Sequence, residues 1–201
     1  PFIYSAALED GYTLASIIND APINHWDKSQ GVAWRPKNSP EVYSGPIRIR
    51  RALAQSKNVV SVRLLRGVGL QRAADHLLKF GFEDEDINRS ESLALGSAAI
   101  TPLEMARGMS TFANGGHLIE PYFISEITDA YGNSLGKAQP LIACDEEHRL
   151  ENAMQCAPQI ISEQNAFLIS SALHSAIWGG GSWKHKTGWV GTGWRAQALK
   201  R

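Results

Sequence analysis

The segment at residues 50–65 reads "RRALAQSKNVVSVRLL", and the interpretation of the whole chain depends on it. Apolar residues recur at helical spacing on both sides of a small polar group, Ser56-Lys57-Asn58. This periodicity predicts helical structure across residues 48–65. The polar group is therefore expected either on a helix surface or at a helix end that faces a cleft.

Ser56 and Asn58 are the residues of this group with the clearest chemical use. The amide of Asn58 can bind a carbonyl through its NH2 group and a lysine through its oxygen, and the Ser56 hydroxyl can pass a proton to a departing amine. Neither group is a strong base, so such a pair needs a nucleophile and a cation from elsewhere. By spacing alone, a polar helix face is the simpler explanation.

The flanking sequence predicts further helices. Residues 2–8 are apolar and precede Gly11, residues 70–82 are amphipathic, and residues 155–178 form a later helical segment. The clearest helix start is "TPLEMARGMSTFANGG", where Thr101 is the expected N-cap, Pro102 takes the first helical position and Glu104 completes a capping box.

Strands are expected to be few. Residues 122–136 predict a strand, a turn and the start of a second strand, whereas residues 13–47 are rich in Pro, Gly, Asn and Ser and are expected to be irregular. Isolated serines such as Ser5 and Ser61 are expected at helix surfaces or core edges. Helices and strands that do not alternate regularly indicate an α+β fold.

Composition excludes several classes of protein. Twenty basic and twenty acidic side chains cancel among 201 residues, so no charge pattern indicates nucleic-acid binding. No apolar run reaches the roughly 18 residues that span a bilayer. The chain starts at Pro1 without Met, inside an expected helix, and ends at "ALKR", so it is expected to be a piece of a longer protein.

Cys144 and Cys156 are the only cysteines. Two isolated cysteines are more commonly free and buried, although an oxidising compartment would allow a disulfide. A metal site that adds His148 would lack a fourth ligand and the usual paired spacing, so it is not expected.

Several segments together resemble the transpeptidase domain of class A penicillin-binding proteins, of the 1A type of Gram-negative bacteria. They are "PFIYSAALEDGYTLASIINDAPI", "WRPKN", "GPIRIRRALAQSKNVVSVRLL", "LALGSAAITPLEMARGMSTFANGG" and "GTGWRAQALKR", in the order of the family. The resemblance implies a penicillin-binding-protein, serine β-lactamase-like fold, here mostly its helical part and truncated at both ends. It weakens between about residues 134 and 160.

The family's chemistry uses three motifs. A serine of an S-x-x-K motif attacks the D-Ala–D-Ala bond of a peptidoglycan stem peptide, an S-x-N motif forms a second wall, and a K-T-G-T strand binds the terminal carboxylate. Ser56 and Asn58 match S-x-N, which implies a proton relay and an amide donor to the acyl group. Lys57, between them, is a further candidate catalytic residue.

The other two motifs are expected outside these residues. The family places its S-x-x-K lysine immediately before "PFIYSAAL", and its K-T-G-T shortly after "GTGWRA". Lys186-Thr187-Gly188 is therefore not assigned to that motif, because Trp189 replaces the expected hydroxyl. Thr192 and Trp194 are candidate substrate-binding residues beside the missing strand.

The resemblance predicts that residues 1–201 form a single partial transpeptidase domain that is inactive alone. The parent protein would be anchored at the periplasmic face of the inner membrane and would also carry a glycosyltransferase. Its partners would be peptidoglycan stem peptides and β-lactams, without a cofactor, metal or nucleic acid. The alternatives are a non-catalytic β-lactam-sensing module or a β-lactamase-like hydrolase on the same fold.

Overall fold

The computed structural model describes residues 1–23, 25–27, 32–144, 155–179 and 193. Its helices are α1 (Phe2–Glu9), α2 (Ile49–Ala54), α3 (Asn58–Val68), α4 (Leu70–Leu78), α5 (Pro102–Ala113) and α7 (Glu163–Trp178), with the short 3₁₀ helices η1 (Asp84–Asp86) and η2 (Glu91–Leu95). Its strands are β1 (Ile17–Asp20), β2 (His25–Asp27), β3 (Val32–Trp34), β4 (Gly45–Arg48), β5 (Glu126–Thr128) and β6 (Ser134–Lys137). None of the described helices is both long and apolar enough to cross a bilayer.

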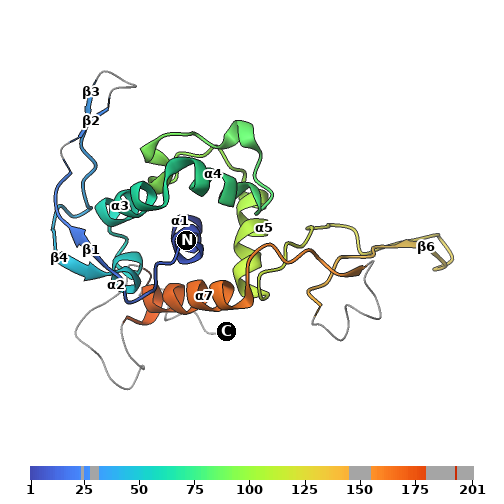
Figure 1. The fold of residues 1–201 in the computed structure, drawn as a ribbon. Coiled ribbons are helices and arrows are strands. Elements are labelled where there is room, and N and C mark those ends of the chain that lie inside the picture. Colours follow the sequence, from blue (N-terminus) through green and yellow to red (C-terminus); the bar gives the residue numbers. More distant parts are fainter. Residues whose placement is uncertain (24, 28–31, 145–154, 180–192, 194–201) are drawn as a thin grey trace.

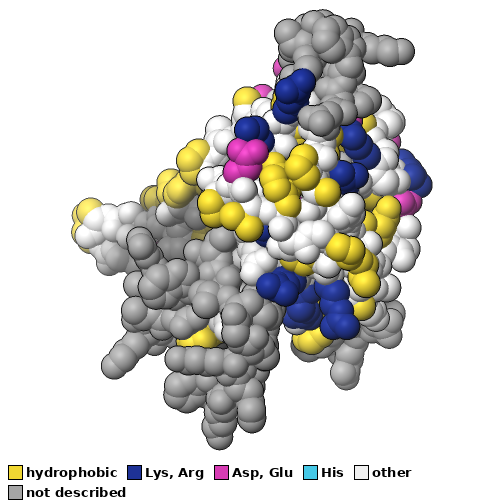
Figure 2. Space-filling model, turned by 90° about the vertical axis from the view of Figure 1, so that its left-hand side faces the viewer, with side chains coloured by type: hydrophobic (Ala, Val, Ile, Leu, Met, Phe, Trp, Pro, Cys, Tyr) yellow, Lys and Arg dark blue, Asp and Glu magenta, His cyan; other side chains and the backbone are white. Residues whose placement is uncertain are grey.

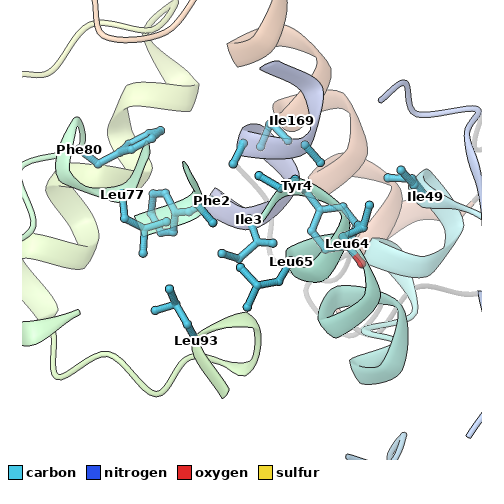
Figure 3. Packing of buried hydrophobic residues seen from close by; sticks show 14 of the residues in the cluster. Phe2, Ile3, Tyr4, Ile49, Leu64, Leu65, Leu77, Phe80, Leu93 and Ile169 are labelled. Atoms are coloured by element: carbon cyan, nitrogen blue, oxygen red, sulfur yellow. The ribbon is translucent and has the colours of Figure 1, made fainter. Parts of the chain in front are cut away.

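Helix α1 is the centre of the core. The other helices surround it, and its six residues from Phe2 to Ala7 are buried, as expected of a helix whose sequence is apolar on every face (Figure 1). Phe2 packs edge-on against Phe80 and Phe82, with ring centroids 4.9 and 5.1 Å apart, and lies close to Leu77 and Ile3 in the core (Figure 3). Helix α1 packs against α3, α4 and α7.

The strands form three separate antiparallel pairs, namely β1 with β4, β2 with β3 and β5 with β6. Residues 13–47 are thus more regular than the sequence predicted, because pairing of β1 with β4 joins residues about 30 positions apart and leaves no local signal. The predicted strand, turn and strand at 122–136 is confirmed as the β5–β6 hairpin, which projects away from the helices (Figure 1).

The predicted helix at 48–65 is divided. It forms α2 and α3, which are separated by Gln55, Ser56 and Lys57. The helices predicted at 2–8, 70–82 and 101–116 are confirmed as α1, α4 and α5 within a few residues. The helix predicted at 155–178 is confirmed only in its later part, since α7 begins at Glu163 and the residues before it include isolated β-bridges at Cys156 and Gln159. At the start of α5 both halves of the capping box are present, since Thr101 accepts from the Glu104 backbone and Glu104 accepts from the Thr101 backbone.

Cys144 and Cys156 form a disulfide, with their Cα atoms 5.4 Å apart. Of the two states that the sequence left open, the disulfide is therefore present, and the more common free state of isolated cysteines is not found. A parallel bridge between Ile142 and Cys156 holds the two backbone segments together, and such a contact cannot be inferred from cysteine spacing. His148, the third member of the rejected metal site, lies outside the described residues.

Figure 2 views the side of the molecule on which β1 and β4 lie. Hydrophobic side chains are interspersed there with Lys and Arg side chains, and Asp and Glu side chains are fewer. Val42 and Ile17 are among the exposed apolar residues of the described chain. The loop at residues 37–44, which precedes β4, binds the buried Asp20 carboxylate.

Candidate functional site

The turn between α2 and α3 has the geometry of a Schellman motif. Ser56 N donates to Leu53 O at 3.0 Å and Lys57 N donates to Ala52 O at 2.9 Å. This motif needs a residue in the left-handed region, and Ser56 takes it with φ +52° instead of the usual glycine. A side chain in that region costs about 1 kcal/mol, so a hydroxyl is held here at an energetic cost.

Ser56 and Asn58 line one pocket. The pocket has a volume of about 330 Å³, which is in the range of small-ligand sites. Pro1 and the N-terminal end of α1 form another part of its wall, and Leu93 and Met109 belong to its apolar part. The arrangement is an apolar hollow with polar groups on α3 and on the turn before it.

Two further hydroxyl groups, those of Ser61 and Tyr4, also line this pocket. Ser61 is three positions after Asn58, which places both on one face of α3. Its Oγ lies 3.2 Å from the Tyr4 hydroxyl of α1. Burial raises the pKa of Tyr4 to about 12, so this phenol stays protonated and serves as a hydrogen-bonding group.

Lys57 is directed away from this pocket. Its ammonium lies 3.1 Å from Asp20 Oδ2 and donates to Val42 O at 2.8 Å. The Asp20 side chain is fully buried, and its carboxylate also accepts from Asn38 Nδ2 at 2.7 Å and from Ser44 N at 2.9 Å. The interior thus holds a carboxylate whose two oxygens both have partners, as burial of a charge requires.

The electrostatic balance at Asp20 favours its charged form. Burial of the carboxylate by itself raises the pKa, but hydrogen bonds from Asn38, the Ser44 backbone and Lys57, together with the positive charge of Lys57, outweigh burial. The pKa of Asp20 is therefore lowered from its ordinary value. The ion pair with Lys57 is intact at neutral pH.

The loop at residues 37–44 is bound to the same turn. Asn58 Nδ2 donates to Lys37 O at 2.8 Å, and Asn38 Oδ1 accepts from Val59 N at 3.2 Å. The hydrogen bond to Lys37 O uses one of the two amide protons of Asn58. The second amide proton and the oxygen of Asn58 make no hydrogen bond to another described residue, and neither does the Ser56 hydroxyl.

The structure thus brings together two of the candidate site residues, Ser56 and Asn58, and directs Lys57 into a buried ion pair. Thr192 and Trp194 lie outside the described residues, as does Lys186. Within the described ranges, no group of three or more His, Cys, Asp or Glu side chains is placed to hold a metal ion.

Sequence interpretation missed Asp20, Asn38 and Ser61. Asn38 lies in "WRPKN" and Asp20 in "SIIND", and nothing local indicates that they meet Lys57. Ser61 was expected at a helix surface or core edge, although its spacing from Asn58 could have placed it beside the pair. Ser5 was expected in a similar position but is fully buried and hydrogen-bonded to His76 and Asn165.

Comparison with known proteins gives consistent results. A family model described as the penicillin binding protein transpeptidase domain matches residues 1–196. Penicillin-binding protein 1A of Vibrio cholerae is 55% identical over 209 residues, which cover 100% of this chain and 25% of that protein. The protein of the same name from Escherichia coli is 42% identical over 242 residues, covering 98% of this chain and 28% of its own length.

A solved structure agrees with these relatives. The crystal structure of penicillin-binding protein 1A from Haemophilus influenzae matches with a TM-score of 0.89 and 44% identity, over 100% of this chain and 32% of that one. The chain thus spans about a quarter to a third of the length of the proteins it matches. The α+β penicillin-binding-protein fold predicted from the sequence is confirmed, and the chain belongs to the penicillin-binding protein transpeptidase domain family.

Proposed function

We propose that this chain is the part of a serine D,D-transpeptidase that carries the S-x-N wall of the active site. The longer protein would cross-link peptidoglycan through an acyl-enzyme formed from D-Ala–D-Ala stem peptides. The observation that carries the proposal is the placement of Ser56 and Asn58 in one pocket with the N-terminal end of α1. In the family, the S-x-x-K motif lies on the chain leading into that helix.

Each group has a task in this reaction. The nucleophilic serine, placed by the family before Pro1, attacks the carbonyl carbon and the D-Ala amine leaves. The Ser56 hydroxyl passes to that amine the proton that the attacking serine loses. The second amide proton of Asn58, which is not bound to the loop, donates to the acyl-side amide of the donor peptide and holds the acyl group in place. An amine of a neighbouring stem peptide then attacks the acyl-enzyme ester and forms the new amide bond, while the serine leaves and regains its hydroxyl proton.

The remaining features belong to the same proposal. The K-T-G-T strand would follow Arg201, Thr192 and Trp194 would border the substrate beside it, and residues 1–201 alone would be inactive. β-Lactams would acylate the serine in place of the donor peptide. The parent would work at the periplasmic face of the inner membrane, and the Cys144–Cys156 disulfide supports an oxidising compartment. It would also carry a glycosyltransferase, as expected for a class A protein.

Intact mass after incubation with penicillin tests the assignment. The 201-residue chain is compared with the full-length protein, and only the latter is expected to gain the mass of one β-lactam. In the full-length protein, Ser56→Ala and Asn58→Ala are each expected to lower the acylation rate by about a hundredfold. Absence of acylation in the full-length protein, or acylation of the 201-residue chain itself, would show the proposal to be wrong.

The two alternatives predict different outcomes. A β-lactamase-like hydrolase would release the bound penicillin quickly, so its mass adduct would disappear within the experiment. A sensing module would keep the adduct but would not cross-link stem peptides. A lasting adduct together with cross-linking of purified peptidoglycan precursors is the expected result.

A further inference from the structure

We propose that Lys57, Asp20 and Asn38 form a positioning cluster that sets the directions of Ser56 and Asn58. The inference rests on the proposed function, because it assigns a role in acylation to residues that touch neither substrate nor nucleophile. It also assigns Lys57 a role other than that of a catalytic side chain. Its basis is the contact between the S-x-N turn and the loop at residues 37–44.

Lys57 connects the two pocket residues to the interior. It follows the left-handed Ser56 and directly precedes α3, so the direction of its side chain is tied to the backbone at both neighbours. Its ammonium is held by Asp20 Oδ2 and Val42 O, and only 11% of the side chain is exposed. Rotation of the turn would therefore move a buried charge away from its partner.

Asn38 fixes the other side of the cluster. It donates to Asp20 Oδ1 and Val42 O and accepts from Val59 N, so every hydrogen-bonding position of the amide is used except one oxygen lone pair. Val59 directly follows Asn58. The loop is thus bound to α3 at its first turn, one residue after the candidate amide donor.

The consequence for Asn58 is a defined orientation. Its Nδ2 donates to Lys37 O, the carbonyl next to Asn38. Since Asn38 is held by Asp20, the position of this carbonyl depends on the buried carboxylate. Displacement of the loop would leave the Asn58 amide free to rotate away from a bound donor peptide.

A matched control lies on the same loop. Lys37 and Glu41 form an ion pair 2.9 Å long, but their side chains are 60% and 53% exposed. An exposed pair contributes little to stability or geometry. Glu41→Ala therefore removes an ion pair from the loop without disturbing the buried cluster.

The experiment uses the full-length protein with penicillin G in excess, and intact mass gives the acylation rate constant. Rates are measured well below the Tm of each variant, so that they report folded molecules only. Lys57→Met and Asp20→Asn are expected to lower this rate constant about tenfold or more, because small misplacements of reactive groups have effects of this size. Lys57→Arg, which keeps the charge, is expected to recover most of the rate, and Glu41→Ala to match the wild type.

The result separates positioning from a purely structural role. A structural role would lower the Tm and the fraction of protein that reacts, but would leave the rate constant of the folded molecules unchanged, and that outcome overturns the inference. If Lys57→Met does not fold, Asp20→Asn decides the question, since it is isosteric with the native residue. A rate loss in Glu41→Ala equal to that in Asp20→Asn also counts against the cluster.

Failure of the proposed function gives a different pattern. If the wild-type protein is not acylated, or if Ser56→Ala and Asn58→Ala react at the wild-type rate, the assignment of the S-x-N wall is wrong. If these two variants are slow while Lys57→Met and Asp20→Asn react normally, the wall is retained and only the positioning cluster is rejected.

Discussion

The Ser5 hydroxyl of α1 donates a 2.9 Å hydrogen bond to the side-chain amide oxygen Oδ1 of Asn165 in α7, across 160 positions of the chain. Because Ser5 has a single hydroxyl proton, its oxygen must accept from His76 Nε2 of α4, which lies 2.9 Å away. The imidazole is thus protonated on Nε2. The buried network joins three helices around the core, and α1 leads from it to the candidate site.

Asn165→Asp should destabilise the protein strongly. Asn165 Nδ2 donates to Ser5 O at 3.0 Å and to Glu9 Oε1 at 2.7 Å, so an oxygen in its place would face two acceptors in a buried site. We expect the free energy of unfolding to fall by about 3 kcal/mol or more, measured by urea denaturation. Asn88→Asp makes the same change at an exposed residue and should be near neutral. Equal stability of the two variants would contradict the network.

Protonation of His76 should destabilise the protein in mild acid. Burial, with a smaller contribution from Lys79, lowers the pKa of His76 from 6.5 to about 4. The unfolded chain binds this proton at higher pH than the folded protein does, so stability is full above pH 6.5 and falls as the pH drops to about 4.

The loss attributable to this residue should approach about 3 kcal/mol. Urea denaturation across this pH range, compared with His76→Gln, measures it, and the variant should show a flatter dependence. If wild type and His76→Gln lose stability in parallel, another group is responsible.

The contribution of Asp20 to stability should change at a lower pH than that of His76. Its folded pKa lies below the ordinary value of 3.8, despite burial, because of its hydrogen bonds and the charge of Lys57. The stability it contributes is therefore present above pH 3.8 and is lost as the pH falls through the lower, folded value. The difference in unfolding free energy between wild type and Asp20→Asn should accordingly be constant at neutral pH and shrink only in strong acid.

Gly116→Ala should be more costly than substitution of another left-handed glycine. Gly116 has φ +98°, and a Cβ there would lie 2.2 Å from the backbone oxygen of Ile161. Gly96 has φ +88° with no atom within 4 Å of such a Cβ. Gly96→Ala should cost about 1 kcal/mol, and Gly116→Ala clearly more, by thermal or urea unfolding. Similar losses would mean that the Ile161 backbone moves freely.

The capping box of α5 should be measurable through Thr101. Thr101→Ala removes the acceptor for Glu104 N and should lower the free energy of unfolding by about 1 kcal/mol. Thr101→Ser keeps the hydroxyl and should stay within a few tenths of the wild type. A similar loss in both variants would indicate that the threonine methyl group, and not the cap, is responsible.

Local sequence determined much of the fold. The start of α5 was predictable because Thr101, Pro102 and Glu104 satisfy the first backbone groups of the helix within one turn. Helices α1 and α7 followed from the same kind of short-range periodicity. The pairing of β1 with β4 was missed, because its hydrogen bonds join segments whose own composition is typical of loops.

The same distinction between local sequence and long-range contacts applies to the candidate site. The sequence alone identified the family and selected Ser56 and Asn58 as candidate site residues, since motif spacing and segment order are properties of the chain. It did not determine that the helix breaks at Ser56, that Lys57 turns inward, or that Cys144 bonds to Cys156. Those outcomes required the tertiary structure, because they depend on contacts between residues that are distant in the sequence. Lys57 takes its direction from Asp20, which lies 37 positions away. The two charges meet only when β1, α3 and the loop at 37–44 pack together.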